Sequence, residues 1–471
     1  MAPFGALRIG SSALRATQTG IQITGQSTAN GGEKYPRRRD SLVASRTTDR
    51  EGLRIGNGVD VQHVERIFDS RLEDMLRGAR SHLGRLSRKS EALSRLELVF
   101  ADTERTGHRH ATSRFFDAAL NLANQPEDLV SRRLFLEAAR DLSCSFRDQD
   151  RALCNLRRDL DFSVENIGRT MNQIGPQIAD LNQRIVFGEN AGSKAHGDSD
   201  PRVRRDALVG QLADLAGVSV QESVDGSFNV FIGSDFIVEG ERAHGVVVDK
   251  SAGGDVPTTN LCFQADNRPV SPPGGALRGL IDARDEIVAR YRDDLNTLAG
   301  AVILEVNRIH RSGEGLLGRT RAISEYPVVD ASATTGLSTF FTGIDAADME
   351  VSQEIANEIR LIATGRGGRP DAGHNMRAIA GLRDVEIPQT NRSTFEQFYG
   401  GITGNLRVET AEARELLENQ GLVTERIQNE RRAISGTDED TVQLVGFQRL
   451  YQDSARYLSV VDTLSQTLMQ I

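Results

Sequence analysis

The stretch FQRLYQDSARYLSVVDTLSQTLMQI, residues 447–471, carries a heptad pattern that runs to the last residue of the chain. Its apolar positions alternate in steps of three and four, a spacing that places them along one stripe of an α-helix. The stripe consists of Phe447, Leu450, Tyr457, Val461, Leu464, Leu468 and Ile471, with Ser454 as its polar member. Such a stripe predicts a helix that packs against a partner helix.

A second, weaker stripe of the same kind lies at the start of the chain. It consists of Phe4, Leu7, Leu14 and Ile21, with Ser11 and Gln18 as its polar members. Because the ends of globular enzymes usually fray, two coiled-coil ends that pack together are typical of an assembly subunit. A terminal helix that faces its own core is the alternative. The predicted assembly interface consists of Leu7, Leu14, Ile21, Phe447, Leu450, Tyr457, Val461, Leu464, Leu468 and Ile471.

The composition favours long, solvent-exposed helices in several domains. Of the 471 residues, 38% are hydrophobic, 5% aromatic and 26% charged, and Trp is absent. A net charge of −9 argues against nucleic-acid binding. No apolar run reaches the length of about 18 residues that membrane insertion requires. The N-terminus also lacks the apolar segment and cleavage site of a signal peptide, so export would need a signal that is not cleaved.

Hydrophobic periodicity divides the chain into helical and extended parts. Helical spacing runs from about 64 to 100, from about 127 to 187 and from about 277 to 310. The Gly175-Pro176 pair is expected to kink the second of these helices. Between about 216 and 265 the period changes to two, which predicts a small β insert.

The predicted fold is mainly α: an elongated multi-domain helical bundle with N- and C-terminal coiled-coil helices packed together and a small β-rich insert. The predicted parts are an N-terminal axial helix and turn-rich hinge segment (1–40), the first part of a long helical bundle (41–215), a β-rich insert (216–273), a bundle helix (274–313), a short outer, irregular region (314–392), a returning bundle helix (393–436) and a C-terminal axial coiled-coil helix (437–471).

The sequence predicts no catalytic residue, no cofactor-binding residue and no metal ligand. His108 and His110 are two positions apart in a predicted charged loop, which is not the spacing of metal ligands on a helix. His310 lies at a predicted helix end, where packing or capping explains it better than catalysis. The glycines at 274–275 and 365–368 lack the Lys-Ser/Thr of a phosphate loop, so we interpret them as turns.

Seven blocks, in order along the chain, resemble one family: flagellar hook-associated protein 1, the FlgK family. They are Gly56-Asn57-Gly58-Val59 with Arg66 and Asp69, FFDAALNLANQPEDLVSRR from Phe115, QIADLNQRI from Gln177, RDALVGQLADLAGVSV from Arg205, GGALRGLIDARDEIVARYRDDLNTLAGAVILEVNRIHRSG from Gly274, ADMEVSQEIA from Ala347, and FQRLYQDSARYLSVVDTLSQTLM from Phe447. The spacing of Asn307, His310 and Gly313 adds specificity.

The resemblance implies a structural subunit of the bacterial flagellum at the hook-filament junction, secreted by type III export. The implied partners are further copies in a junction ring, the hook protein, a second junction protein on the filament side, and a cytoplasmic export chaperone at the C-terminal helix. Nucleic acid and membrane insertion are not implied. The alternatives are another secreted axial or tail-tip structural protein, or an enzyme, which would place perturbed ionisable groups in a concave pocket.

Two departures from the family pattern concern the N-terminal hinge and the outer region. Ser27-Thr28 and Glu33-Lys34-Tyr35 stand where the family usually has an Asn-Ile pair and a Thr-x-Gly-Tyr element. The region from 314 to 346 is much shorter than the outer domain that many relatives carry there. We therefore expect a minimal outer domain.

Overall fold

The fold is mainly helical with a small β insert, which confirms the predicted fold class. The computed structural model describes residues 2–29, 38–44, 48–50, 53–55, 58–66, 69–102, 107–190, 201–251, 258–317, 339–367, 369, 371–435 and 437–469. The chain divides into two compact units. Unit 1 comprises residues 1–82, 173–244 and 420–471, and unit 2 comprises residues 83–172 and 245–419.

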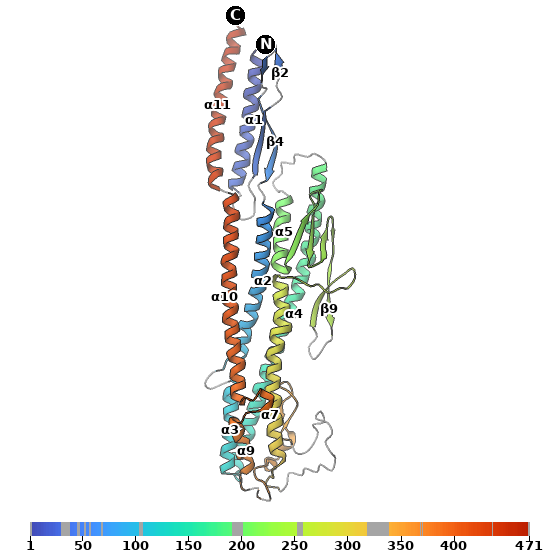
Figure 1. Cartoon of the computed structure of the whole chain (residues 1–471), viewed down its shortest axis with the longest axis vertical. Helices are drawn as coiled ribbons and strands as arrows, with labels where there is room; N and C mark the ends of the chain where they lie inside the picture. The colour runs from blue at the N-terminus through green and yellow to red at the C-terminus, as the bar shows by residue number, and fades with distance from the viewer. Residues whose placement is uncertain are drawn as a thin grey trace. The chain divides into compact units, whose positions relative to one another are not determined.

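In unit 1 the two terminal helices lie side by side. Helix α1 (Ala2–Ala29) packs against α11 (Thr437–Met469), and strand β4 (Val59–Arg66) lies along α1 (Figure 1). The contacts run in opposite directions along the chain: Gly10 of α1 faces Leu458, and Gly20 faces Phe447. The pair is therefore antiparallel, and the prediction that the terminal helices pack together is confirmed.

Strands occupy the region that follows α1. Strand β1 (Arg38–Ala44) pairs antiparallel with β4, and β2 (Thr48–Arg50) pairs with β3 (Leu53–Ile55). The expectation that the helical bundle begins at residue 41 is therefore wrong, since the next helix, α2, spans Ser70–Val99. The sequence of β1, RRDSLVA, places charged residues next to one another, so the alternation that reveals a strand is weak there.

Long helices follow the predicted spans closely. Helix α4 covers Leu129–Asn190, 62 residues without a break, which at 1.5 Å per residue is roughly 90 Å. It remains helical through Pro176. Helix α10 spans Phe395–Ser435 and begins with a reciprocal cap, in which Gln397 N donates to Thr394 Oγ1 at 3.2 Å and Thr394 N donates to Gln397 Oε1 at 3.1 Å.

The β insert follows α5 (Pro201–Ala216), as its period of two predicts. In unit 1 the strands β5 (Val218–Glu222), β6 (Phe228–Ile232), β7 (Asp235–Glu239) and β8 (Arg242–Ala243) form one antiparallel sheet in sequence order. In unit 2, β9 (Val246–Ser251) pairs with β10 (Thr258–Phe263). Phe228, Val230 and Ile232 are buried, while the residues between them are half-buried, so one face of the sheet is its core side.

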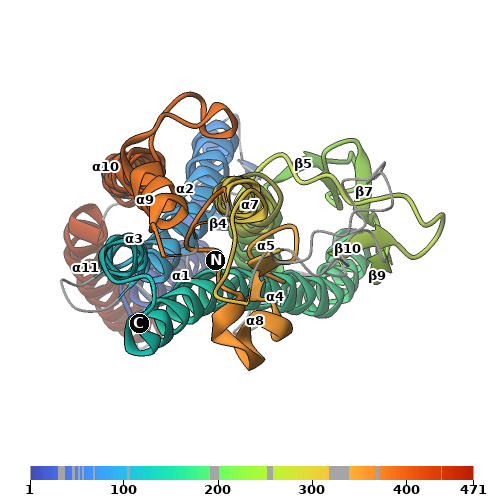
Figure 2. The ribbon, with the colours of Figure 1, turned by 90° about the horizontal axis from the view of Figure 1, so that it is seen from below.

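Unit 2 has a core rich in phenylalanine. Helix α3 (His108–Asn124) lies beside α9 (His374–Gly381), which also contacts α7 (Ala289–Arg311) (Figure 2). Helix α6 (Gly275–Asp282) continues into α7 through a π-helical turn at Ala283–Val288. The phenylalanines of unit 2 that are at most 3% exposed are Phe115, Phe116, Phe135, Phe146, Phe340, Phe341 and Phe395.

The described part of the region 314–392 consists of short pieces, as the sequence predicts. In chain order these are β11 (Phe341–Thr342), β12 (Glu350–Val351), α8 (Gln353–Asn357), a 3-10 turn at Ile359–Leu361, α9, and 3-10 turns at Leu382–Asp384 and Pro388–Thr390.

Candidate assembly interface

Two glycines set the distance between α1 and α11. A Cβ atom at Gly10 would lie 2.6 Å from Leu458 Cδ2, and one at Gly20 would lie 2.8 Å from Phe447 Cε1. A larger residue at either position would force the Leu458 or Phe447 side chain to move, so the two glycines let α11 pack closely against α1 without that shift. Sequence reasoning missed the role of these glycines because a heptad pattern counts large apolar residues.

The buried face of α1 consists mostly of small residues. Its buried positions are Gly10, Ala16, Thr17, Gly20, Ile23 and Thr24. The predicted interface residues Leu7, Leu14 and Ile21 are only half-buried. The predicted stripe therefore lies beside the face that is buried, and the close approach at the glycines explains the difference.

Helix α11 divides the predicted stripe between two environments. Val461 is buried and Phe447 is half-buried against Gly20. By contrast, the second set of heptad positions keeps much of its surface: Leu450 is 54% exposed, Tyr457 44% and Leu464 58%. We call Leu450, Tyr457 and Leu464 the outer stripe. The Leu468 side chain and Ile471 lie outside the described residues.

Gly58 and Val59, at the start of strand β4, lie against α1. Gly58 has a φ of +105°, and a Cβ atom there would lie 1.9 Å from Ser12 Oγ. The Val59 N–H donates to Ser12 Oγ at 3.2 Å. This position needs glycine for two reasons, the left-handed backbone and the contact with α1.

In unit 1 a buried arginine and asparagine hold the β sheet against α4 and α5. Arg205 is fully buried and donates from Nη1 to Asn182 Oδ1 at 3.0 Å and to the Gly226 carbonyl at 2.6 Å. Its guanidinium carbon lies 3.4 Å from the centre of the Phe228 ring. Asn182 in turn donates to the carbonyls of Phe228 and Gly240, and accepts from the Phe228 N–H. Two of the family-like blocks, those around Asn182 and Arg205, thus share one structural cluster.

In unit 2 the motif of Asn307, His310 and Gly313 binds neighbouring backbone. Asn307 Oδ1 accepts from the N–H groups of Phe340 at 2.8 Å and Phe341 at 2.9 Å, and its Nδ2 donates to the Phe341 carbonyl at 2.8 Å. His310 is fully buried, and its Nε2 accepts from the Ala363 N–H at 3.1 Å. These contacts assign packing roles to the motif.

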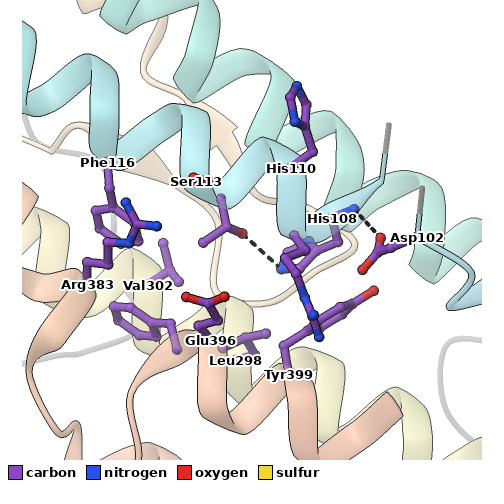
Figure 3. A pocket seen from close by; sticks show the side chains of 13 residues that line it. Asp102, His108, His110, Ser113, Phe116, Leu298, Val302, Arg383, Glu396 and Tyr399 are labelled. Atoms are coloured by element: carbon purple, nitrogen blue, oxygen red, sulfur yellow. Dashed lines mark hydrogen bonds between the residues drawn. The ribbon is translucent and has the colours of Figure 1, made fainter. Parts of the chain in front are cut away.

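Unit 2 also contains a cavity of about 430 Å³, lined by residues of α3, α7 and α10 (Figure 3). His108 is the first residue of α3, so its predicted place in a loop is wrong. Its main-chain N–H donates to Asp102 Oδ1 at 2.8 Å, and its Nδ1 lies 3.0 Å from Ser145 Oγ. The sequence did not indicate this cavity, because its walls come from segments far apart in the chain.

Two ionisable groups in the cavity wall, His108 and Tyr399, have pKa values shifted away from neutral pH. Burial lowers the pKa of His108 to about 3. Burial, together with the nearby Asp102 carboxylate, raises the pKa of Tyr399, whose hydroxyl accepts from Gln149 Nε2 at 2.8 Å. A general acid or base works best with a pKa near the working pH, so neither group is suited to proton transfer near pH 7.

The described residues show neither of two further features, a metal site and a membrane-spanning helix. They contain no group of three or more His, Cys, Asp or Glu side chains arranged to hold a metal ion. No helix among them is both long and apolar enough to cross a membrane.

The fold and contacts define a mainly helical protein with paired terminal helices and an apolar stripe left uncovered on one of them. Residues 93–322 match the family model described as the flagellar hook-associated protein FlgK helical domain. By this match the chain is similar to the FlgK family of flagellar hook-associated proteins.

Similar proteins agree with this assignment over nearly the whole chain. Flagellar hook-associated protein 1 of Bacillus subtilis (strain 168) is 23% identical over 494 residues, covering 96% of this chain and 95% of the relative. The protein of the same name from Escherichia coli (strain K12) is 23% identical over 517 residues, covering 93% and 94%. The solved structure of the flagellar hook junction protein FlgK from Burkholderia pseudomallei matches with a TM-score of 0.63 and 14% identity, over 76% of this chain and 99% of that one.

Proposed function

We propose that this chain is a structural subunit of the bacterial flagellum that forms the hook-filament junction and assembles through its terminal helices. The observation that carries the proposal is the outer stripe, where Leu450, Tyr457 and Leu464 stay 44–58% exposed on a helix already paired with α1. The names of the similar proteins support the flagellar role.

The outer stripe is suited to contact a neighbouring copy of the chain. Its members repeat every seven residues, so they form a continuous apolar row along α11. Covering each large apolar side chain is worth roughly 1.5–3 kcal/mol, which favours association of subunits. A contact between two different faces of identical subunits generates a ring or a helical array. This geometry fits a junction ring in which α1 and α11 line the axis.

The further partners follow from the family. We propose the hook protein on one side of the ring and a second junction protein on the filament side. Before export through the type III apparatus, a cytoplasmic chaperone would cover the C-terminal helix, because an amphipathic helix can lie in a groove of a partner. The secreted chain would then reside in the flagellum.

An enzyme is the alternative that one observation favours, namely the cavity with its shifted His108 and Tyr399. Both groups are stabilised in their neutral forms, His108 by burial and Tyr399 by burial beside Asp102. The cavity therefore supports binding better than acid-base chemistry, and the structural role is the better supported function.

The test separates folding from assembly. Leu450→Asp with Leu464→Asp places two charges on the outer stripe, and both positions are more than half exposed in the subunit. Tyr457 is left unchanged because its ring also lies against Gly10 of α1. We expect the double variant to fold and to be exported but to be absent from isolated flagella, as imaged with a label on this chain. Leu422→Asp is the matched control, because Leu422 is 60% exposed on α10 and lies outside the stripe. Normal incorporation of the double variant would refute assembly through α11.

A further inference from the structure

We propose that the cavity in unit 2 binds a small zwitterionic molecule with an apolar side chain, of the chemical class of a free hydrophobic α-amino acid. Its volume of about 430 Å³ is within the range of roughly 300–1,000 Å³ that small-molecule sites occupy. This binding activity is independent of the proposed assembly through α11.

The floor of the cavity is apolar and firmly packed. Four of its lining side chains belong to the core of unit 2 and are at most 3% exposed: Phe116, Leu298, Val302 and Phe395. They come from α3, α7 and α10, so the floor is shaped by three helices. Such a surface suits an aromatic or branched aliphatic group.

Charged groups of both signs surround this floor. Arg109 and Glu396 line the cavity with exposed side chains, and neither takes part in an ion pair between described residues. Figure 3 shows the Glu396 carboxylate over the cavity, on the same side as Phe116 and Val302. Arg383 also lines it and pairs with Asp117 at 3.1 Å, an exposed contact that leaves the guanidinium accessible.

The other polar groups of the wall already have partners. Asp102 accepts from the His108 main chain, and its carboxylate also contacts the Tyr399 hydroxyl. The His108 ring lies against Ser145, Thr112 and two aromatic rings. A ligand therefore meets Arg109 and Glu396 first, because their charges are not yet matched within the described chain.

This arrangement selects for a ligand that carries both charges. A guanidinium binds a carboxylate through two parallel hydrogen bonds, and a carboxylate accepts from an ammonium group. Arg109 and Glu396 carry opposite formal charges, so a ligand with a single charge would leave one of them unmatched. An α-amino acid supplies a carboxylate, an ammonium and an apolar side chain within one small molecule.

The test compares three probes on the full chain by isothermal titration calorimetry. L-phenylalanine carries both charges, 3-phenylpropionate lacks the ammonium, and phenethylamine lacks the carboxylate. We expect L-phenylalanine to bind at least tenfold more tightly than either of the others. Absence of saturable L-phenylalanine binding overturns the proposal, and so does equal or tighter binding of a singly charged probe.

Two substitutions then locate the site. Glu396→Gln should weaken L-phenylalanine binding at least tenfold and leave 3-phenylpropionate binding unchanged, whereas Arg109→Gln should weaken both. Both side chains are exposed, so the fold is expected to tolerate the changes. Glu354→Gln, on the surface of α8 in the same unit, is the matched control and should bind as the unmodified chain does. Binding that neither Glu396→Gln nor Arg109→Gln weakens would place the ligand elsewhere and overturn the assignment.

Discussion

The terminal helix pair and the core of unit 2 are stabilised by opposite means. Between α1 and α11 the contact depends on absent side chains, since Gly10 and Gly20 let α11 approach, and the outer stripe stays exposed. In unit 2, large aromatic side chains fill the core, and buried polar side chains bind the backbone of the irregular segments. The core is complete within one chain, whereas the terminal pair retains an apolar surface that a neighbouring subunit can cover.

This difference matches the demands on the structural subunit proposed above. A unit that must hold its shape benefits from dense packing and satisfied buried polar groups. A surface that must associate with a neighbouring subunit benefits from apolar groups that remain accessible in the single chain. Perturbing each region should therefore have different consequences, and the predictions below run from the largest expected effect to the smallest.

The buried His108 should make the stability of unit 2 depend on pH. Burial lowers the pKa of His108 in the folded chain from its ordinary value of 6.5 to about 3, so between these pH values the unfolded chain binds a proton at His108 more readily than the folded chain does. This stability is fully present above pH 6.5 and is lost as the pH falls toward 3, by on the order of 4 kcal/mol. The measurement is denaturant unfolding between pH 7 and pH 3.

The control for this prediction is a pair of neighbouring variants. His108→Gln has no titrating ring, so its unfolding should depend less on pH than that of the unmodified chain. His110→Gln, two residues along the chain and only partly buried, should retain the full dependence. If all three proteins show the same slope, then His108 does not supply the pH dependence and the core has a different acid-sensitive group.

The backbone contacts of Asn307 provide the next test of the unit 2 core. Asn307→Ala would leave the N–H groups of Phe340 and Phe341 and the Phe341 carbonyl without their partner. Each unsatisfied buried group costs about 1–3 kcal/mol, so we expect local destabilisation of about 3 kcal/mol. Hydrogen exchange at the Phe340 and Phe341 amides measures it directly.

Asn296→Ala is the comparison for this variant. Asn296 also accepts from a backbone N–H, that of Ala346, but through a single, partly buried bond of 3.3 Å. Its loss should cost less than about 1.5 kcal/mol. Equal effects of the two substitutions would show that the three bonds of Asn307 do not act together.

The long elements of the fold could be predicted from the sequence because their periodicity persists. The helical spacing from about 127 to 187 became α4, and the change to a period of two near 216 became β5 to β10. The pairing of the chain ends could also be predicted, since two apolar stripes without an internal partner favour each other. In each case the hydrophobic periodicity of the segment itself was sufficient for the prediction.

The details of the interface could not be predicted, because they depend on how α11 is rotated against α1. The heptad of α11 has two apolar positions in each repeat, and the sequence treats Val461 and Leu464 alike. The structure buries the first and leaves the second 58% exposed. The cavity escaped prediction for a related reason: His108, Val302 and Glu396 meet only after three helices have packed.

The glycines of α1 provide the smallest and most discriminating test. Gly20→Leu should separate α1 from α11, because a Cβ atom there already lies 2.8 Å from the Phe447 ring, and overpacking costs about 1–3 kcal/mol. Gly25→Leu is its matched control, since no atom lies within 4 Å of a Cβ atom at that position. There the change should stabilise the helix by about 0.5–1 kcal/mol, because glycine is a poor helix former.

Hydrogen exchange of the α1 amides in the single chain decides between these effects. We expect protection to fall about tenfold in Gly20→Leu, which corresponds to about 1.4 kcal/mol, and to rise in Gly25→Leu. Exchange in the core of unit 2 should be unchanged in both variants, because neither residue belongs to that unit. If Gly20→Leu raises protection as Gly25→Leu does, then helix propensity governs α1 and the close approach of α11 at Gly20 does not. The contrast between a terminal pair set by glycines and a core set by aromatic residues would then have to be abandoned.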